Sequence, residues 1–453
     1  MRCLVTGLVS LLALRAGMSF AQGVSASVPG PPMLPNYERI PVGEREALEA
    51  GAFIARTGDA NANWYNPAGL ALAERTAANV SASAYEASVL EVASVKRRTD
   101  NLRLSPIGSF FGLVIGPPIV SGSTRYGAYI AQPLSWRSGT LNDETPVDAT
   151  TTFGAISDAN LTRYEPGIAL GMRAGAAFRL GAALGVSVTT MDLSQDLVVR
   201  RSYADSVSSL RRTLAVSGTS WDVVARIGMQ WDLPGQWRFG AVATAPGLQM
   251  FGSTRLTYGS SNHSSAGRYI DVSLRDEEAD FEYRLPFSAG AGLARLFSRG
   301  AVEATVRYFG SVDEYDMISS DVLATQIDAP AGGPPVTTTL AVAPITNSWR
   351  EVVNVAVGGN YAWTKALLIH LGVTTDNSPV ADPERSAFRK VHLVGGTAGV
   401  SYQGESFGGS LGLGYSAGSS DPIEMIAADG APPVETRIKV RTFRAMYSFT
   451  ARF

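Results

Sequence analysis

The chain end shows the pattern that most constrains the fold. Within residues 441–453, RTFRAMYSFTARF, one set of alternate positions holds Phe443, Tyr447, Phe449 and Phe453, and the other holds mainly Arg, Thr and Ser. Successive side chains of a β-strand point to opposite sides, so this segment predicts a strand with one apolar and one polar face. A soluble sandwich would hide such an apolar face in its core. An aromatic-rich strand at the chain end favours a barrel whose apolar face is turned outward to lipid.

The same alternation recurs upstream over residues 178–189, 221–232, 302–308 and 407–415. Segments of this kind have about the 9–11 residues that a membrane-spanning strand needs. Trp and Tyr lie near their ends, as an aromatic girdle requires. We predict fourteen strands, at residues 76–90, 107–117, 124–136, 161–174, 177–192, 217–231, 237–247, 284–296, 300–310, 348–362, 366–375, 390–403, 406–418 and 440–453.

Short and long connections alternate between these predicted strands, as they do in outer-membrane barrels. The short ones cover residues 118–123, 175–176, 232–236, 297–299, 363–365 and 404–405. The long ones cover residues 91–106, 137–160, 193–216, 248–283, 311–347, 376–389 and 419–439. An even strand number then places both chain ends on the side of the short turns, which is the periplasmic side.

Composition agrees with a membrane barrel and excludes other classes. Of 453 residues, 47 are Gly and only 17% are charged, which is few for a soluble protein of this size. No segment after Ala21 has the 18 or so consecutive apolar residues of a membrane-spanning helix, and a closed barrel is the other structure that satisfies every backbone polar group in lipid. The net charge of −2 gives no basis for nucleic-acid binding.

Residues 1–21 read as a signal peptide. Arg2 precedes an apolar run that is interrupted by Arg15, and small residues stand before a cleavage point after Ala21. The single cysteine, Cys3, lies inside this segment, so we expect no disulfide and no thiol chemistry in the mature chain.

Residues 22–75 lack the alternation of the strands. They begin Pro-rich and end in GDANANWYNPAGLA, where Asp59 is a helix-start signal and Asn66-Pro67 a turn signal. A segment that enters the barrel from its periplasmic end is well placed to fold into the lumen. We therefore expect a lumenal hatch at 22–75 and a transmembrane barrel at 76–453.

At this point the chain resembles the FadL-type outer-membrane transporters of long-chain fatty acids and aromatic hydrocarbons. GDANANWYNPAGLA looks like the hatch signature, with Asn66, Pro67, Ala68 and Gly69 as its motif. WRFGAVATAPGLQMFGSTRLTY is similar to the mid-barrel hairpin, and WREVVNVAVGGNYAWTKALLIHLGVTTDNSPV followed by FRKVHLVGGTAGVSY looks like the late strands.

The resemblance implies passive uptake of a hydrophobic small molecule and lateral exit into the membrane after the hatch shifts. A kink in the third strand opens the wall in that family, and here the third strand contains Gly127 and Pro133. Proline cannot donate to the strand ladder, so Pro133 predicts a local break. The alternative is that Pro133 sits above the membrane, where the strand becomes loop. The chain end resembles the signal for membrane insertion, carried by Tyr447, Phe449 and Phe453.

Charged residues fall on the polar phase of several strands and are expected to face the lumen. One interpretation is a lattice of ion pairs between wall and hatch, and the other is that one or two arginines hold an anionic head group. These positions are Arg173, Arg179, Arg226, Glu303, Arg307, Arg444 and Arg452.

Three histidines without a mature-chain cysteine give no metal constellation, so neither metal nor cofactor is expected. His370 lies on the polar phase of its strand and His392 on the apolar phase of another, which argues against converging catalytic groups and hence against an enzyme.

Expected partners are the hydrophobic ligand, outer-membrane lipid with lipopolysaccharide, and the barrel-assembly machinery; the barrel is expected to be a monomer. Two rival functions stay open, a general porin and a structural or secretion-linked barrel. The residues do not distinguish a fatty acid from a neutral hydrocarbon.

Overall fold

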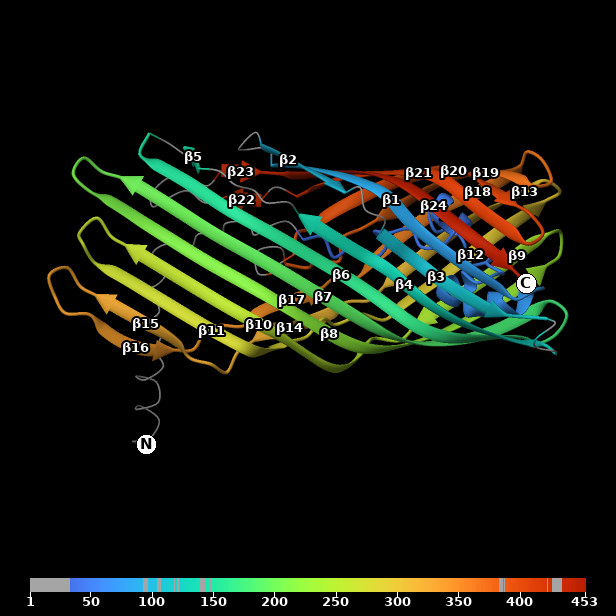
Figure 1. Cartoon of the computed structure of the whole chain (residues 1–453), viewed down its shortest axis with the longest axis horizontal. Helices are drawn as coiled ribbons and strands as arrows, with labels where there is room; N and C mark the ends of the chain where they lie inside the picture. The colour runs from blue at the N-terminus through green and yellow to red at the C-terminus, as the bar shows by residue number, and fades with distance from the viewer. Residues whose placement is uncertain are drawn as a thin grey trace, which may run out of the picture.

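A closed antiparallel barrel makes up most of the computed structural model, which describes residues 33–92, 97–103, 107–117, 119, 122–138, 144–146, 149–382, 386, 388–421, 423–425 and 434–453. Each barrel strand pairs with the next, and the last pairs with the first through Ala77 and Arg452 (Figure 1). The signal peptide expected at residues 1–21 lies outside the described residues.

The ring contains fourteen strands, which confirms the predicted number and order. Its members, each paired with its neighbour in this order, are β1 (Ala77–Val92), β3 (Ile107–Ile115), β4 (Thr124–Ser138), β6 (Thr151–Arg173), β7 (Phe178–Ser202), β8 (Val207–Leu233), β9 (Trp237–Thr244), β12 (Ser288–Phe297), β13 (Gly300–Phe309), β18 (Val352–Ala362), β19 (Leu367–Asp376), β20 (Val391–Gln403), β21 (Phe407–Ser420) and β24 (Ile438–Arg452).

The long connections are largely strands, which corrects the expectation of loops there. β7 and β8 remain paired to Ser202 and Val207, so the predicted loop at 193–216 is a hairpin extension. These extensions rise beyond the region where one face meets lipid, so polar residues occupy both faces and the alternation fades. The further strands are β2 (Arg97–Arg103), β5 (Glu144–Pro146), β10 (Leu248–His263), β11 (Tyr269–Phe281), β14 (Val312–Ser319), β15 (Ala324–Ala329), β16 (Val336–Leu340), β17 (Ile345–Trp349), β22 (Ile423–Met425) and β23 (Val434–Thr436).

Large apolar side chains cover the outside of the barrel. Ile168, Ile227 and Leu411 are 65%, 64% and 66% exposed, and they belong to three different strands. A soluble protein rarely exposes so extensive an apolar surface. In the described part of the chain, no helix has the length and apolarity to cross a membrane.

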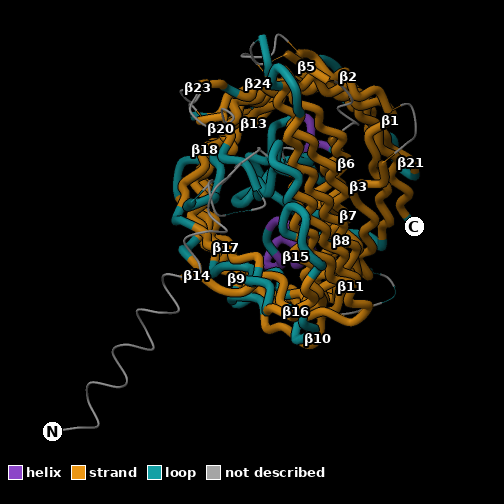
Figure 2. Tube along the Cα trace, turned by 90° about the vertical axis from the view of Figure 1, so that its left-hand side faces the viewer, coloured by secondary structure: helices purple, strands orange, loops and turns teal. Residues whose placement is uncertain are grey.

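Residues 33–75, here called the lumenal segment, lie inside the ring of strands (Figure 2). The segment contains the short helices α2 (Arg45–Leu48) and α3 (Ala62–Tyr65) and the 3-10 helix η1 (Pro67–Leu72). Most of its side chains are buried, and η1 packs on β6, β7 and β8. The segment packs in the half of the lumen near the short turns. Other side chains fill the opposite half.

A large apolar cluster lies in that opposite half. Leu134 and Trp136 of β4, Leu161 of β6 and Met191 of β7 are buried there in one continuous cluster. Met33 and Leu34 of the lumenal segment belong to the same cluster, as do Val380 and Phe388 of the β19–β20 connection. We call this cluster the apolar vestibule. A uniformly polar lumen, the usual condition of such barrels, is therefore not what this chain builds.

Candidate functional site

Asn66 joins the lumenal segment to the barrel wall. Its side-chain amide donates to the backbone carbonyls of Ile54 and Met229, at 2.9 Å each, and its Oδ1 accepts from the N–H of Ala68 at 3.2 Å. The side chain thus caps η1, while Pro67 at the first position of η1 needs no donor partner. Asn is required here because one side chain both donates to the wall and accepts from the helix.

Glycines of the wall let the motif approach closely. A Cβ on Gly181 of β7 would collide with the backbone of Pro67, and one on Gly228 of β8 would collide with Asn66. Gly69 has the same role from the other side, because a Cβ there would meet the carbonyl of Thr57. The many strand glycines therefore include contact positions for the lumenal segment.

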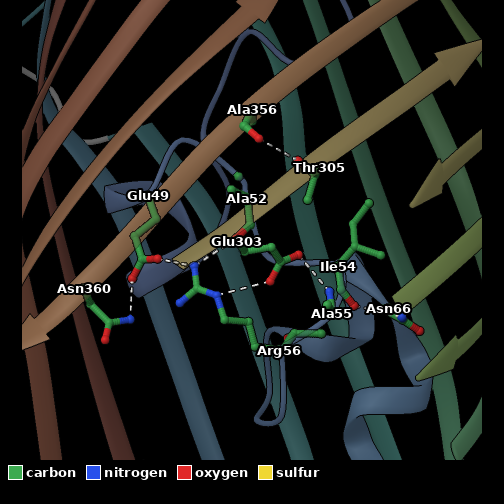
Figure 3. Close-up of polar contacts among 12 residues, drawn as sticks. Glu49, Ala52, Ile54, Ala55, Arg56, Asn66, Glu303, Thr305, Ala356 and Asn360 are labelled. Atoms are coloured by element: carbon green, nitrogen blue, oxygen red, sulfur yellow. Dashed lines mark hydrogen bonds and ion pairs between the residues drawn. The ribbon is translucent and has the colours of Figure 1, made fainter. Parts of the chain in front are cut away.

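An ion network fastens the lumenal segment to the opposite wall (Figure 3). Arg56 pairs with Glu49 of the same segment and, at 3.1 Å, with Glu303 of β13. Glu303 also accepts from the N–H of Ala55 at 2.8 Å, and Arg56 stacks on the Phe53 ring at 4.0 Å. Both carboxylates are fully buried, so Arg56 is the group that offsets their charge.

His370 extends this network in a way that the sequence did not reveal. Its Nδ1 lies 2.7 Å from Glu49 Oε1 and its Nε2 lies 2.8 Å from Ser401 Oγ. The order Ser, His, Glu resembles a hydrolytic triad, but all three side chains are buried and none lines the cavity described next. The arrangement is therefore a contact between segment and wall. The only indication of this contact in the sequence was that His370 lies on the polar face of its strand.

A cavity of about 190 Å³ lies between the lumenal segment and the apolar vestibule. On one side Arg226 of β8 donates to Glu165 of β6 at 3.0 Å and lies over the Trp64 ring at 4.6 Å. The hydroxyl of Tyr129 donates to the same Glu165 oxygen at 2.8 Å. Aromatic and charged groups thus meet on one wall.

The other side of the cavity is built in the same way. Arg307 of β13 pairs with Glu38, donates to the carbonyl of Gly51 at 2.8 Å, and lies over the Tyr65 ring at 5.4 Å. Arg444 of β24 also lines the cavity.

The remaining predicted inward charges lie outside the cavity. Arg179 pairs with Asp232 near the short turns, and Arg173 donates to the carbonyl of Ala71 at 3.1 Å. Glu303 belongs to the Arg56 network. Arg452 donates to the carbonyl of Gly404 at 3.0 Å. The structure therefore brings Arg226, Arg307 and Arg444 together at the cavity and uses the others as contacts of the segment or the rim.

Pro133 lies at an irregularity of β4. The pairing of β4 with β6 shifts between Ala131 and Leu134, and the carbonyl of Pro133 accepts from the N–H of Ile40 at 3.3 Å. β4 itself continues to Ser138. On its other side, pairing with β3 ends at Ala131, and no further partner of β4 is found there among the described residues. The neighbour of this break is Ile40, whereas Asn66 and Pro67 contact β7 and β8.

Gly127 lies lower on the same strand and contacts the lumenal segment. A Cβ there would collide with Asn63, whose amide donates to the carbonyl of Leu113 at 3.0 Å.

At the chain end, Tyr447, Phe449 and Phe453 point outward, with Phe449 52% exposed. Among the described residues, no three His, Cys, Asp or Glu side chains gather closely enough to hold a metal ion.

No protein-family model matches the sequence, and no curated protein matches it. Solved structures do match. A Pseudomonas aeruginosa FadL homologue aligns with a TM-score of 0.61 at 15% identity, over 92% of this chain and 100% of that one. The P. putida toluene transporter TodX aligns with a TM-score of 0.59 at 16% identity, over 91% and 99%. The CymD monoaromatic hydrocarbon channel gives 0.55 at 14% identity, over 92% and 99%. The chain therefore has the fold of the FadL-type barrels.

Proposed function

We propose that this protein lies in the outer membrane of a Gram-negative bacterium and takes up hydrophobic small molecules, either long-chain fatty acids or hydrocarbons, without an energy source. The outward apolar surface supports the membrane location. The solved barrels of the same fold that are described as a toluene transporter and a monoaromatic hydrocarbon channel support the class of solute.

The apolar vestibule is the observation that carries the proposal. A water-filled pore offers an apolar solute no favourable environment, whereas burial of apolar surface contributes about 25 cal/mol per Å². The vestibule lies at the end of the barrel away from the short turns, and the cavity lies beneath it. The lumenal segment, which includes the hatch motif Asn66 to Gly69, then stands between the cavity and the periplasm. A captured solute therefore has to move the segment or leave through the wall.

Movement of the lumenal segment is tested by locking it to β4. A Cβ on Gly127 would lie 2.8 Å from the Cγ of Asn63, so cysteines at these two positions are within reach of a disulfide. We expect cells carrying Asn63→Cys/Gly127→Cys to take up radiolabelled oleate or toluene several-fold more slowly when the pair is oxidised than when it is reduced. Equal rates in both states would exclude movement of the segment and leave uptake itself intact.

Exit through the wall beside Pro133 is tested with a second disulfide. The β3–β4 ladder ends at Phe110 and Ala131, and Ser109 and Gln132 are the next residues of the two strands, so Ser109→Cys/Gln132→Cys is designed to close the boundary where pairing ends. The matched control, Phe111→Cys/Ile130→Cys, joins the strands where they are already paired. We expect slower uptake only from the first pair. Wild-type rates through it would rule out Pro133 and Gly127 as parts of a lateral gate.

The rival functions give different results. A general porin conducts ions in planar bilayers without any change to the chain. A structural or secretion-linked barrel shows no difference in uptake between cells with and without the protein.

A further inference from the structure

Six buried polar atoms without a hydrogen-bond partner among the described residues gather where the apolar vestibule meets the central cavity. They come from the lumenal segment, from three neighbouring strands and from the β11–β12 connection. We call them the junction site: Tyr37 OH, Arg163 Nε, Ser187 Oγ, Thr189 Oγ1, Asp222 Oδ2 and Tyr283 OH.

The strand register places four of these side chains on one patch of wall. Arg163 of β6 is the direct partner of Thr189 on β7, and Ser187 of β7 is the direct partner of Asp222 on β8. Directly opposed residues of antiparallel strands have Cβ atoms about 4.5–5.5 Å apart. All four are at least nine-tenths buried, so they point into the lumen and away from lipid.

The two tyrosines come from other parts of the chain. Tyr37 belongs to the lumenal segment, and the backbone N–H of Tyr283 donates to Ser220 Oγ of β8 at 3.3 Å. Tyr37 and Arg163 line the same cavity, and the charge of Arg163 acts on Tyr37, Tyr283 and Asp222. The Tyr37 ring stacks on Phe309 at 4.4 Å between ring centres, and the Tyr283 ring packs edge-on against Phe388 at 6.1 Å. Because packing fixes both rings, their hydroxyls are held in place.

The free-energy cost of burying these unpaired groups indicates that a ligand binds them. A buried polar group without a partner costs about 1–3 kcal/mol, and here six such atoms share one location. Tyr37 and Arg163 also line the cavity, so a molecule that enters the cavity reaches the junction site. Packing alone does not account for the placement of hydroxyls against an apolar vestibule.

The charges of the site select the kind of ligand. Arg163 and Asp222 have opposite formal charges and form no ion pair with each other among the described residues, so an added carboxylate or ammonium would face a like charge at one of the two. A carboxylate would be repelled by Asp222 and an ammonium by Arg163. A hydroxyl donates to Asp222 and accepts from Arg163 or a tyrosine at the same time.

We propose that the junction site binds the uncharged hydroxyl head group of an amphiphile whose apolar tail lies in the cavity, against Leu285 and Leu393 at the edge of the apolar vestibule. This inference rests on the proposed function and narrows its solute class to an alcohol. A hydroxyl has one donor and two acceptor sites, so it pairs with up to three of the six groups and can serve Asp222 and a donor together, which neither an ionised fatty acid nor a plain hydrocarbon does.

The test compares three probes with the same chain length, 1-decanol, decanoate and decane, by equilibrium dialysis against the full chain in detergent micelles. We expect 1-decanol to bind at least tenfold more tightly than either of the other two. Equal affinity for decanol and decane would overturn the junction site, because water alone would then satisfy its groups. Failure of all three probes to bind would overturn the proposed function as well.

Two conservative variants separate a binding role from a structural one. Ser187→Ala and Thr189→Val each remove a buried hydroxyl that has no partner, so the free protein should be as stable as the wild type or more stable. Each should nevertheless lower the affinity for 1-decanol about three- to tenfold and leave that for decane unchanged. Unchanged decanol affinity in both variants would contradict the proposal.

The matched control is Ser410→Ala on β21. Ser410 Oγ already bonds Ser448 Oγ at 2.7 Å, so this change removes a satisfied hydroxyl. We expect a small loss of stability and no change in affinity for any probe. An equal loss of decanol affinity in this control would show that the variants act through the barrel as a whole.

Discussion

At the residue scale, two buried glutamates of the lumenal segment have pKa values that are shifted in opposite directions. Glu46 has no hydrogen-bond partner for either side-chain oxygen among the described residues, and burial raises its pKa well above the ordinary value. Burial also acts on Glu49, but Arg56 and the hydrogen bond with His370 outweigh it and lower the pKa of that carboxyl. Glu46 therefore keeps its proton to a higher pH than an ordinary carboxyl, whereas Glu49 loses its proton at a lower pH.

The Glu46→Gln variant should be more stable than the wild type, by an amount that grows with pH. Near pH 4 the carboxyl is protonated in both the folded and the unfolded chain, so the two proteins are alike. Above the ordinary carboxyl pKa only the unfolded chain ionises, which costs the wild type about 1.4 kcal/mol per pH unit until the raised pKa is reached. Urea unfolding in micelles between about pH 4 and pH 8 measures the difference. A constant gain across this range would show that Glu46 is ionised in the folded chain.

Arg56 should matter more than either of its partners, because its removal takes away the cation that two buried carboxylates share and leaves only Glu49 with further side-chain contacts, such as that with His370. We expect Arg56→Gln to destabilise the lumenal segment by about 3–5 kcal/mol. Hydrogen exchange of the backbone amides of residues 45–60 reports the loosening. Glu303→Gln added to Arg56→Gln should restore part of the protection, because it removes one of the two charges. Further loss in the double variant would argue against the network.

At the element scale, η1 packs against positions of the barrel wall that are occupied by glycine. A methyl group on Gly181 would occupy the space of the Pro67 backbone, so η1 has to move if one is added. A Cβ on Gly310 meets its nearest atom, the carbonyl oxygen of Phe287, at 3.5 Å, which is ordinary contact. The two glycines therefore form a matched pair of substitution sites.

Gly181→Ala should open a path for ions past the displaced segment, whereas Gly310→Ala should not. Planar-bilayer recordings measure this directly: the wild type and Gly310→Ala should be almost silent, and Gly181→Ala should show steady conductance. A silent Gly181→Ala barrel with native heat-modifiable migration would mean that the segment adjusts without opening the lumen.

At the scale of the whole molecule, the outward apolar surface has to match the membrane in height. Ile227 projects from the middle of the lipid-facing region of β8, six residues before that strand ends at Leu233. Val207 is comparably exposed, at 55%, but begins the same strand at the tip of the β7–β8 hairpin. Only the first position should lie in hydrocarbon.

Ile227→Arg should destabilise the folded barrel in bilayers by about 2–4 kcal/mol, and Val207→Arg by about 0–1 kcal/mol. Unfolding midpoints in lipid vesicles give both values. Similar costs at the two sites would place the membrane boundary beyond the hairpin tip.

Much of the architecture follows from local signals. Alternation at 178–189 and 221–232 predicted β7 and β8, because one face of each strand meets lipid and the other does not. The same alternation put Ser187, Thr189 and Asp222 on inward positions. The Asn-Pro signal at 66–67 predicted a turn, and the structure has the 3-10 helix η1 there, because side-chain capping and a proline at the first helical position act within a few residues.

What the sequence by itself determined is the number and order of the ring strands and the inward or outward face of the side chains in their alternating segments, because period two and turn chemistry are local properties. The tertiary structure alone decided which inward side chains meet. Arg56 contacts Glu303, which lies about 250 positions further along the chain, and Glu49 contacts His370, which lies more than 300 positions further. No sequence pattern connects residues at such separations. Barrel closure sets those distances, because each strand's height and angle depend on all the pairings around the ring. The same closure makes the outer lumen apolar and brings Tyr37 and Tyr283 to the wall patch of Arg163.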